Sequence, residues 1–144
     1  MLLNVSIRRR WIPDLLGNDK LPSDRQIIVE YDKPNAINRN AWQRRVATTK
    51  QDGSMHVYTD TDVRAILTGS NVSIINLSVK TGERKDENGK SVDIVSQITT
   101  GEALATTRSD YCYMLATQLA QKIMEIEISS ELLKNSEPDS GPAY

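Results

Sequence analysis

Residues 109–128, SDYCYMLATQLAQKIMEIEI, carry the strongest secondary-structure signal in the chain. Apolar side chains recur there at spacings of three and four, which is the period of one face of an α-helix. Ser109 or Thr107 can cap the first turn. We therefore expect one main helix that ends near Ile128 and packs an apolar face on a sheet. The residues of that face are Tyr111, Leu115, Leu119, Ile123 and Ile126, widened by Met114 and Ala116.

Two shorter apolar runs upstream of this helix predict a β-hairpin. They are VSIINLSV at residues 72–79 and VDIVSQI at residues 92–98. The polar residues 80–91 between them contain Asn88-Gly89, a good turn signal. We therefore expect a hairpin with a long, charged tip. In the first strand, alternation predicts one face made of Ile75, Leu77 and Val79 and another made of Val72 and Ile74.

Three further strands are expected in the first half of the chain. Residues 3–7 and residues 27–31 alternate apolar with other side chains, and Pro34 closes the second of these runs. Residues 54–60, SMHVYTD, are rich in β-branched and aromatic types, which favour strands. These runs supply the additional strands of a small sheet.

A short helix is predicted at residues 59–70, TDTDVRAILTGS. Asp60 or Thr61 can cap it and Gly69 suits its end. Its apolar face consists of Val63, Ile66 and Leu67. Residues 35–51 stay open between a helix and an extended segment, because their apolar stripe is weak and Asn and Thr are frequent.

The sum of these elements is an α+β fold. A small antiparallel or mixed sheet, which includes the long-tipped hairpin, packs against one main C-terminal helix plus a short helix. We place a single α+β domain at residues 1–134. Residues 135–144 are rich in Pro, Gly and Ser and are expected to form a flexible C-terminal tail.

The composition is that of an ordinary soluble globular protein of one domain, with 144 residues, 38% hydrophobic and 26% charged. The one cysteine cannot form an internal disulfide, which favours a reducing compartment. No apolar run approaches the roughly 20 residues of a membrane span. In the first ten residues the charges follow the apolar run, the reverse of a secretory signal. We therefore expect a cytosolic-type protein without a membrane partner.

Enzyme chemistry finds little support in the sequence. The one histidine, His56, lies in a predicted strand, and Cys112 reads as a small, partly buried hydrophobic residue beside two tyrosines. Structural zinc needs about four Cys or His ligands, and the glycines are too scattered for a phosphate-binding loop. We predict no catalytic residue, no metal and no cofactor.

Charge is distributed unevenly along the chain. Residues 1–50 carry ten Lys/Arg and five Asp/Glu, whereas residues 51–144 carry eight and fourteen. The two halves can attract each other within one fold, or copies can stack with a basic face on an acidic face. Both interpretations stay open, and the second implies a homo-oligomer.

The basic half also contains the residues that we single out as candidate partner-binding residues. Trp and Arg are the types most enriched at protein-binding hot spots, and both gather here. A groove of Arg and aromatic side chains could also hold a nucleic acid, although a sequence pI of about 5.8 weighs against this alternative. The candidates are Arg8, Arg9, Arg10, Trp11, Ile12, Pro13, Gly17, Asn18, Leu21, Trp42, Arg44 and Arg45.

Several of these candidates belong to the segment WIPDLLGNDKLPSD, residues 11–24. Pro13, Gly17-Asn18 and Pro22 prevent it from forming one regular element, so we expect an ordered loop with a helical turn at residues 13–16. The loop either docks on a partner or plugs one end of the sheet.

The order of these pieces resembles small proteins encoded among the tail genes of tailed bacteriophages. The segment of residues 11–31, the strand at 72–77, the helix start at 100–104 and the closing Lys134-Asn135-Ser136 carry the resemblance. It implies a tail-assembly chaperone or a small structural protein of the tail or neck, with other phage proteins as partners. Such a protein acts in the host cytoplasm during assembly, or in the virion.

If the resemblance holds, residues 11–22 form the docking feature. In that case Gly17-Asn18 makes the turn and Arg8 to Arg10 form a charged rim. The apolar anchors are Trp11, Ile12, Pro13 and Leu21.

Overall fold

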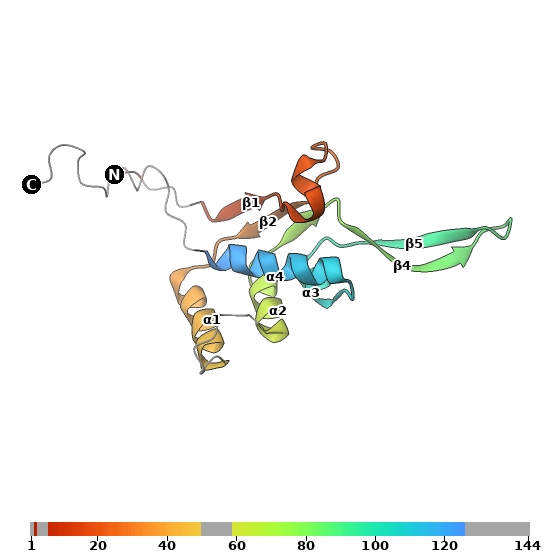
Figure 1. The fold of residues 1–144 in the computed structure, drawn as a ribbon. Helices are drawn as coiled ribbons and strands as arrows, with labels where there is room; N and C mark the ends of the chain where they lie inside the picture. The colour runs from red at the N-terminus through yellow and green to blue at the C-terminus, as the bar shows by residue number, and fades with distance from the viewer. Residues whose placement is uncertain (1, 3–5, 50–58, 126–144) are drawn as a thin grey trace, which may run out of the picture.

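The computed structural model of the chain describes residue 2, residues 6–49 and residues 59–125, and for residues 45–49 the backbone alone. It confirms the α+β class, with antiparallel strands and helices around one core (Figure 1). Side chains from the sheet, from the helices and from the loop between them join in this core. Its largest fully buried members are Tyr31, Ile66, Leu67, Ile74, Leu104, Leu115, Leu119 and Ile123.

Three strands form an antiparallel sheet in the order β1-β2-β3. They are β1 (Arg8–Trp11), β2 (Ile28–Asp32) and β3 (Ser73–Ile75). The strand predicted at residues 27–31 is confirmed, because Val29 and Tyr31 are buried on its core face.

The start of the sheet differs from the prediction. The arginine run is itself the first strand, whereas residues 3–5 lie outside the described residues and residues 6–7 are not part of a strand. Pairing explains this shift, because Arg8 stands opposite Asp32 and Arg10 opposite Glu30. Opposite charges across neighbouring strands favour this register.

The strand predicted at residues 72–79 is interrupted. Asn76 has a φ of +64° and separates β3 from β4 (Ser78–Lys85). Its side-chain Nδ2 donates to the backbone oxygens of Asp24 at 3.1 Å and Gln26 at 2.8 Å. Because of the break, Ile75 and Leu77 do not share a face as predicted: Leu77 is buried, while Ile75 is 53% exposed.

The predicted hairpin is confirmed, and its tip is shorter than expected. Strand β4 pairs antiparallel with β5 (Ser91–Gln97). The turn is therefore confined to residues 86–90, where Gly89 has a φ of +77°. The carboxylate of Asp86 accepts from the backbone N–H groups of Asn88 at 2.8 Å and Lys90 at 2.9 Å, and so fixes the turn.

The main helix is α4 (Asp110–Met124), which ends before the predicted Ile128 and is capped by Ser109, one of the two predicted caps. Figure 1 shows it beneath the sheet, with the other helices on its far side. Met114 is half exposed and so does not belong to the apolar face, whereas Cys112 is buried within it. Residue 126 lies outside the described residues. A further short helix, α3 (Gly101–Thr106), precedes α4 and is capped by Thr100. The apolar pattern did not predict it as a separate helix.

The predicted short helix is α2 (Asp60–Thr68), and its buried apolar face is the expected one. Its cap is Thr59, whose hydroxyl accepts from the Asp62 N–H at 3.2 Å, rather than Asp60 or Thr61. The strand predicted at residues 54–60 is not confirmed, since residues 54–58 lie outside the described residues and α2 begins at Asp60.

The segment that the sequence left open is helix α1 (Ala36–Thr49). Trp42 anchors it on α2, because a Cβ placed on Gly69 would lie 3.0 Å from the Trp42 ring. The tail predicted at residues 135–144 lies outside the described residues. Within the described ranges, every helix is too short or too polar to cross a membrane.

Candidate functional site

The first arginine of the run is engaged within the protein. The Arg8 guanidinium contacts Asp32 Oδ1 at 3.1 Å and donates to the Asn71 carbonyl at 2.6 Å. Its Nε also lies 3.6 Å from a carboxylate oxygen of Glu30. Arg8 therefore fastens β1 to β2 and to the turn before β3. Partly exposed ion pairs of this kind contribute about 0–1 kcal/mol each.

The other two arginines diverge from each other. Strand geometry places Arg8 and Arg10 on one face of the sheet and Arg9 on the other. The Arg9 guanidinium donates to the backbone oxygen of Ser6 at 2.7 Å. Arg10 is exposed. The three arginines therefore do not make one continuous charged rim.

Asn18 holds together the loop that follows β1. It is 2% exposed, and its Nδ2 donates to the carbonyls of Pro13 at 2.7 Å and Ile27 at 3.0 Å. Its Oδ1 accepts from the Ile27 N–H at 2.7 Å. The ordered loop is confirmed, but its helical turns are of the 3₁₀ type, lie within η1 (Leu15–Lys20), later than predicted, and are interrupted by a kink at Leu16 and Gly17. Pro13 and Asn18 therefore shape the loop from inside it.

The outside of this loop presents apolar side chains to solvent. Ile12 and Leu21, both predicted to bind a partner, are exposed. Leu16 is 86% exposed with a φ of +52°, beside Gly17 with a φ of +76°. Leu16 is not among the residues predicted from the sequence, because its exposure depends on this left-handed turn. Trp11 packs partly against the core.

The candidates on α1 form a separate surface. Trp42 is half buried against α2, and Arg44 is exposed. The Arg45 side chain lies outside the described part of the structure. Figure 1 shows β1 and α1 apart from each other, so the arginines and tryptophans of the nucleic-acid alternative do not share one groove.

The most prominent surface feature is the hairpin of β4 and β5, which we call the hairpin arm (residues 78–97). It extends away from the sheet and the helices (Figure 1). Among the described strands, β4 and β5 pair only with each other, so both outer edges of the arm are unpaired. Such edges are templates for pairing with another chain. The sequence predicted this hairpin without marking it as a site.

One face of the hairpin arm carries a charged network. Lys80 Nζ lies 2.5 Å from a carboxylate oxygen of Glu83 and 3.1 Å from one of Asp93. The Ser91 hydroxyl donates to the other Glu83 oxygen at 2.9 Å. Glu83 and Asp93 raise the pKa of Lys80, while Lys80 and then Ser91 lower the pKa of Glu83.

The opposite face of the hairpin arm carries an apolar stripe. It starts at Val79, which packs against the core, and continues through Ile94 to Val92. Gly82 leaves room for the Ile94 side chain, whose Cδ1 would lie 3.7 Å from a Cβ at that position. Ile94 is 41% exposed, and Val95 on the charged face is 57% exposed.

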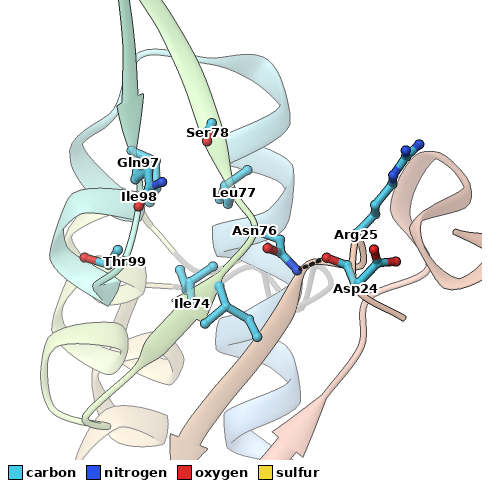
Figure 2. Close-up of a pocket in the computed structure, with 10 residues that line it drawn as sticks. Asp24, Arg25, Ile74, Asn76, Leu77, Ser78, Gln97, Ile98 and Thr99 are labelled. Atoms are coloured by element: carbon cyan, nitrogen blue, oxygen red, sulfur yellow. Dashed lines mark hydrogen bonds between the residues drawn. The ribbon is translucent and has the colours of Figure 1, made fainter. Parts of the chain in front are cut away.

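Hollows flank the root of the hairpin arm. One, of about 480 Å³, is lined by residues 24–25, 74–78 and 97–99. Figure 2 shows Asn76 and Asp24 on one wall of it and Ile98 and Thr99 on another. A second, of about 520 Å³, is lined by residues 77–81, residues 107–109 and Tyr111. These hollows are therefore open to a partner that binds the arm.

Within the described residues, the groups considered for catalysis do not form a site. Cys112, predicted to be partly buried, is fully buried, and residue 56 lies outside the described residues. Among the residues that the structure does describe, no three His, Cys, Asp or Glu side chains gather to hold a metal. Burial raises the pKa of Tyr111, with a smaller effect from Cys112, and its hydroxyl donates to the Leu15 carbonyl at 3.5 Å.

Comparison with known proteins gives no relative. No family model matches the chain, and no curated protein or solved structure does so either. A proposal about function therefore rests on the surfaces described above.

Proposed function

We propose that this chain is a non-enzymatic structural or assembly protein that works through protein–protein contacts, with the hairpin arm as its main contact element. The observation that carries the proposal is the arm itself: two strands that extend from the body, expose Ile94 and Val95, and have outer edges with which no described strand pairs. A two-stranded hairpin alone is at best marginally stable in water. Contact with a partner would cover its apolar stripe and stabilise it.

The resemblance to tail-module proteins of tailed bacteriophages gives this proposal its biological setting. The partners are then other phage structural or assembly proteins, or further copies of this chain. The exposed loop residues Ile12, Leu16 and Leu21 supply a second contact surface on the body. Arms and loops that fit neighbouring copies are a simple way to build a repeating assembly.

Co-purification of the full chain with the proteins encoded beside it tests the proposal. The arm variant Ile94→Ser/Val95→Ser should lose at least tenfold of the captured partner, because it removes exposed apolar contact area. Met114→Ser is the matched control, since it removes a half-exposed apolar side chain of α4 that lies outside both contact surfaces, and it should leave capture unchanged. Equal capture by the arm variant and the wild type would refute the role of the arm.

Nucleic-acid binding is the second candidate, and α1 is the observation that favours it. No Asp or Glu occurs from residue 33 to residue 51, while five Lys or Arg do. A salt-dependent shift of labelled DNA, weakened by Arg39→Gln/Arg44→Gln, would support this function. Because Arg8 and Arg9 have partners within the chain, the variant Arg8→Ala/Arg9→Ala/Arg10→Ala should matter less. Absence of any shift at low salt would remove this candidate.

A further inference from the structure

The two outer edges of the hairpin arm differ in chemistry. Strand β4 carries four charged residues, and Thr81 forms a bulge that interrupts its pairing with β5. Charged side chains and bulges are devices that keep an edge strand from pairing with another chain. Strand β5 has neither a bulge nor a Gly or Pro, and Asp93 is its one charged residue. Of the two edges, that of β5 is therefore the better template for a further strand.

Backbone hydrogen bonds show which residues of β5 direct their N–H and C=O groups away from the hairpin. The Ile98 N–H donates to the Leu77 carbonyl at 2.9 Å, and the Asp86 N–H donates to the Lys90 carbonyl at 2.8 Å. The even-numbered residues therefore face β4, because these groups alternate along a strand. The odd-numbered residues within 91–97 direct theirs to the other side, where no described strand pairs with them.

This edge is complementary to itself in one antiparallel register. Outward-facing residues of one strand must stand opposite outward-facing residues of the other. With Ile94 opposite Ile94 of a second copy, Asp93 stands opposite Val95 and all seven residues of β5 are paired. The carboxylate of each strand then has no like charge directly opposite it. A shift of two residues towards the turn would set Asp93 opposite Asp93 of the second copy, which is unfavourable.

The same register covers apolar side chains that the arm leaves in solvent. Because residue 94 directs its backbone groups to β4, it meets its counterpart as a non-hydrogen-bonded pair, in which the side chains lie closest. Ile94 is 41% exposed and Val95 is 57% exposed. Contact between the two Ile94 side chains joins the apolar stripes of both arms into one surface.

We propose that two copies of this chain associate through β5, so that their hairpin arms form one antiparallel sheet with two strands from each copy. The Ile94 residues meet at its two-fold axis. A sheet of more than two strands with an apolar face has a stability that an isolated hairpin lacks. This inference rests on the proposed function and deepens it, because it assigns the partner, the edge and the register of the hairpin arm.

Cysteine cross-linking of the full chain tests the register. Cys112 is fully buried and should not react. In Ile94→Cys the new thiols face each other with Cα atoms about 4.5 Å apart, which a disulfide can span. Mild oxidation should link more than half of this variant into dimers. Val92→Cys is the matched control on the same stripe: its counterpart lies four residues further along the opposite strand, roughly 13 Å away, so linking should be at least tenfold weaker.

Two proline variants test which edge is used, by light scattering on the chain without other proteins. Val95→Pro removes an outward N–H of β5 that the hairpin does not use, and an edge strand tolerates proline there. It should convert a dimer of twice 16.1 kDa into the monomer. Lys85→Pro is the matched control, because it removes an outward N–H from the β4 edge, and it should leave the dimer intact.

The outcomes separate this inference from the proposed function. Equal linking of Ile94→Cys and Val92→Cys, or linking of neither, would overturn the register. A dimer that Lys85→Pro disperses and Val95→Pro does not would assign the contact to β4 and overturn the choice of edge, and a dimer that survives both prolines would refute pairing through β5. A wild-type monomer that captures another protein through the arm would overturn this inference and leave the proposed function standing.

Discussion

At the scale of single residues, hydrogen bonds from polar side chains fix the course of the backbone at places where the hydrophobic pattern predicts no regular element. Asn18 and Asn76 each donate to two backbone carbonyls, which for Asn18 lie at the two ends of its own loop and for Asn76 lie 50 and 52 residues earlier in the chain. Asn76 does so with a positive φ, which asparagine tolerates better than most residues. These two side chains fix the loop after β1 against the sheet and turn the chain into the hairpin arm.

Replacement of Asn18 should be the most harmful polar substitution in the loop. The variant Asn18→Ala leaves the buried Ile27 N–H and the Pro13 carbonyl without their partner, and each unsatisfied group costs about 1–3 kcal/mol. We expect the free energy of unfolding to fall by about 2–4 kcal/mol in urea denaturation. Asn40→Ala on the exposed side of α1 is the control and should change it by less than about 0.5 kcal/mol. Equal effects at both positions would contradict this role.

At the scale of elements, the sequence predicted those parts whose signal is local. The apolar periodicity of α4, the capped α2 and the Asn88-Gly89 turn are all present in a window of a few residues. The β3–β4 break could not be predicted in this way, because it depends on hydrogen bonds from Asn76 to a loop 50 residues earlier in the chain. Strand β1 was missed for a similar reason, because Arg8 pairs with Glu30 and Asp32 across the sheet.

The candidate site was predictable to a smaller extent. The sequence marked Trp and Arg residues by type, but the fold separates them, since Arg9 turns to the face opposite Arg8 and Arg10. The sequence predicted the hairpin, but it did not predict that the hairpin extends beyond the core. Only the tertiary structure reveals that Val79 is the last residue of the first strand packed on the core.

The pairing of Glu83 with Lys80 on the charged face of the hairpin arm should depend on pH. Lys80 and Ser91 lower the pKa of Glu83, so this pairing contributes above the ordinary carboxyl pKa and is lost as pH falls through the lowered value. A titration of side-chain carboxyl signals by NMR should place Glu83 below 4.5. Lys80→Met should return the Glu83 pKa towards that value, while Lys85→Met should not. An ordinary Glu83 pKa in the wild type would contradict the network.

At the scale of the whole molecule, the body and the hairpin arm have different characters. The body buries its apolar side chains in one core that joins the sheet and the helices. The arm leaves Ile94 and Val95 in solvent and has its backbone edges unpaired by any described strand. The arm therefore offers apolar surface that contact with a partner would cover, and this difference between body and arm is what supports the proposed structural or assembly function.

The measurement that tests this claim most directly is the molar mass of the full chain by size-exclusion chromatography with light scattering. It should be made over a range of concentrations, alone and with the proteins encoded beside it. The account predicts a species heavier than the 16.1 kDa monomer, either an oligomer or a stable complex, which Ile94→Ser/Val95→Ser disperses. A 16.1 kDa monomer under every condition would contradict the account.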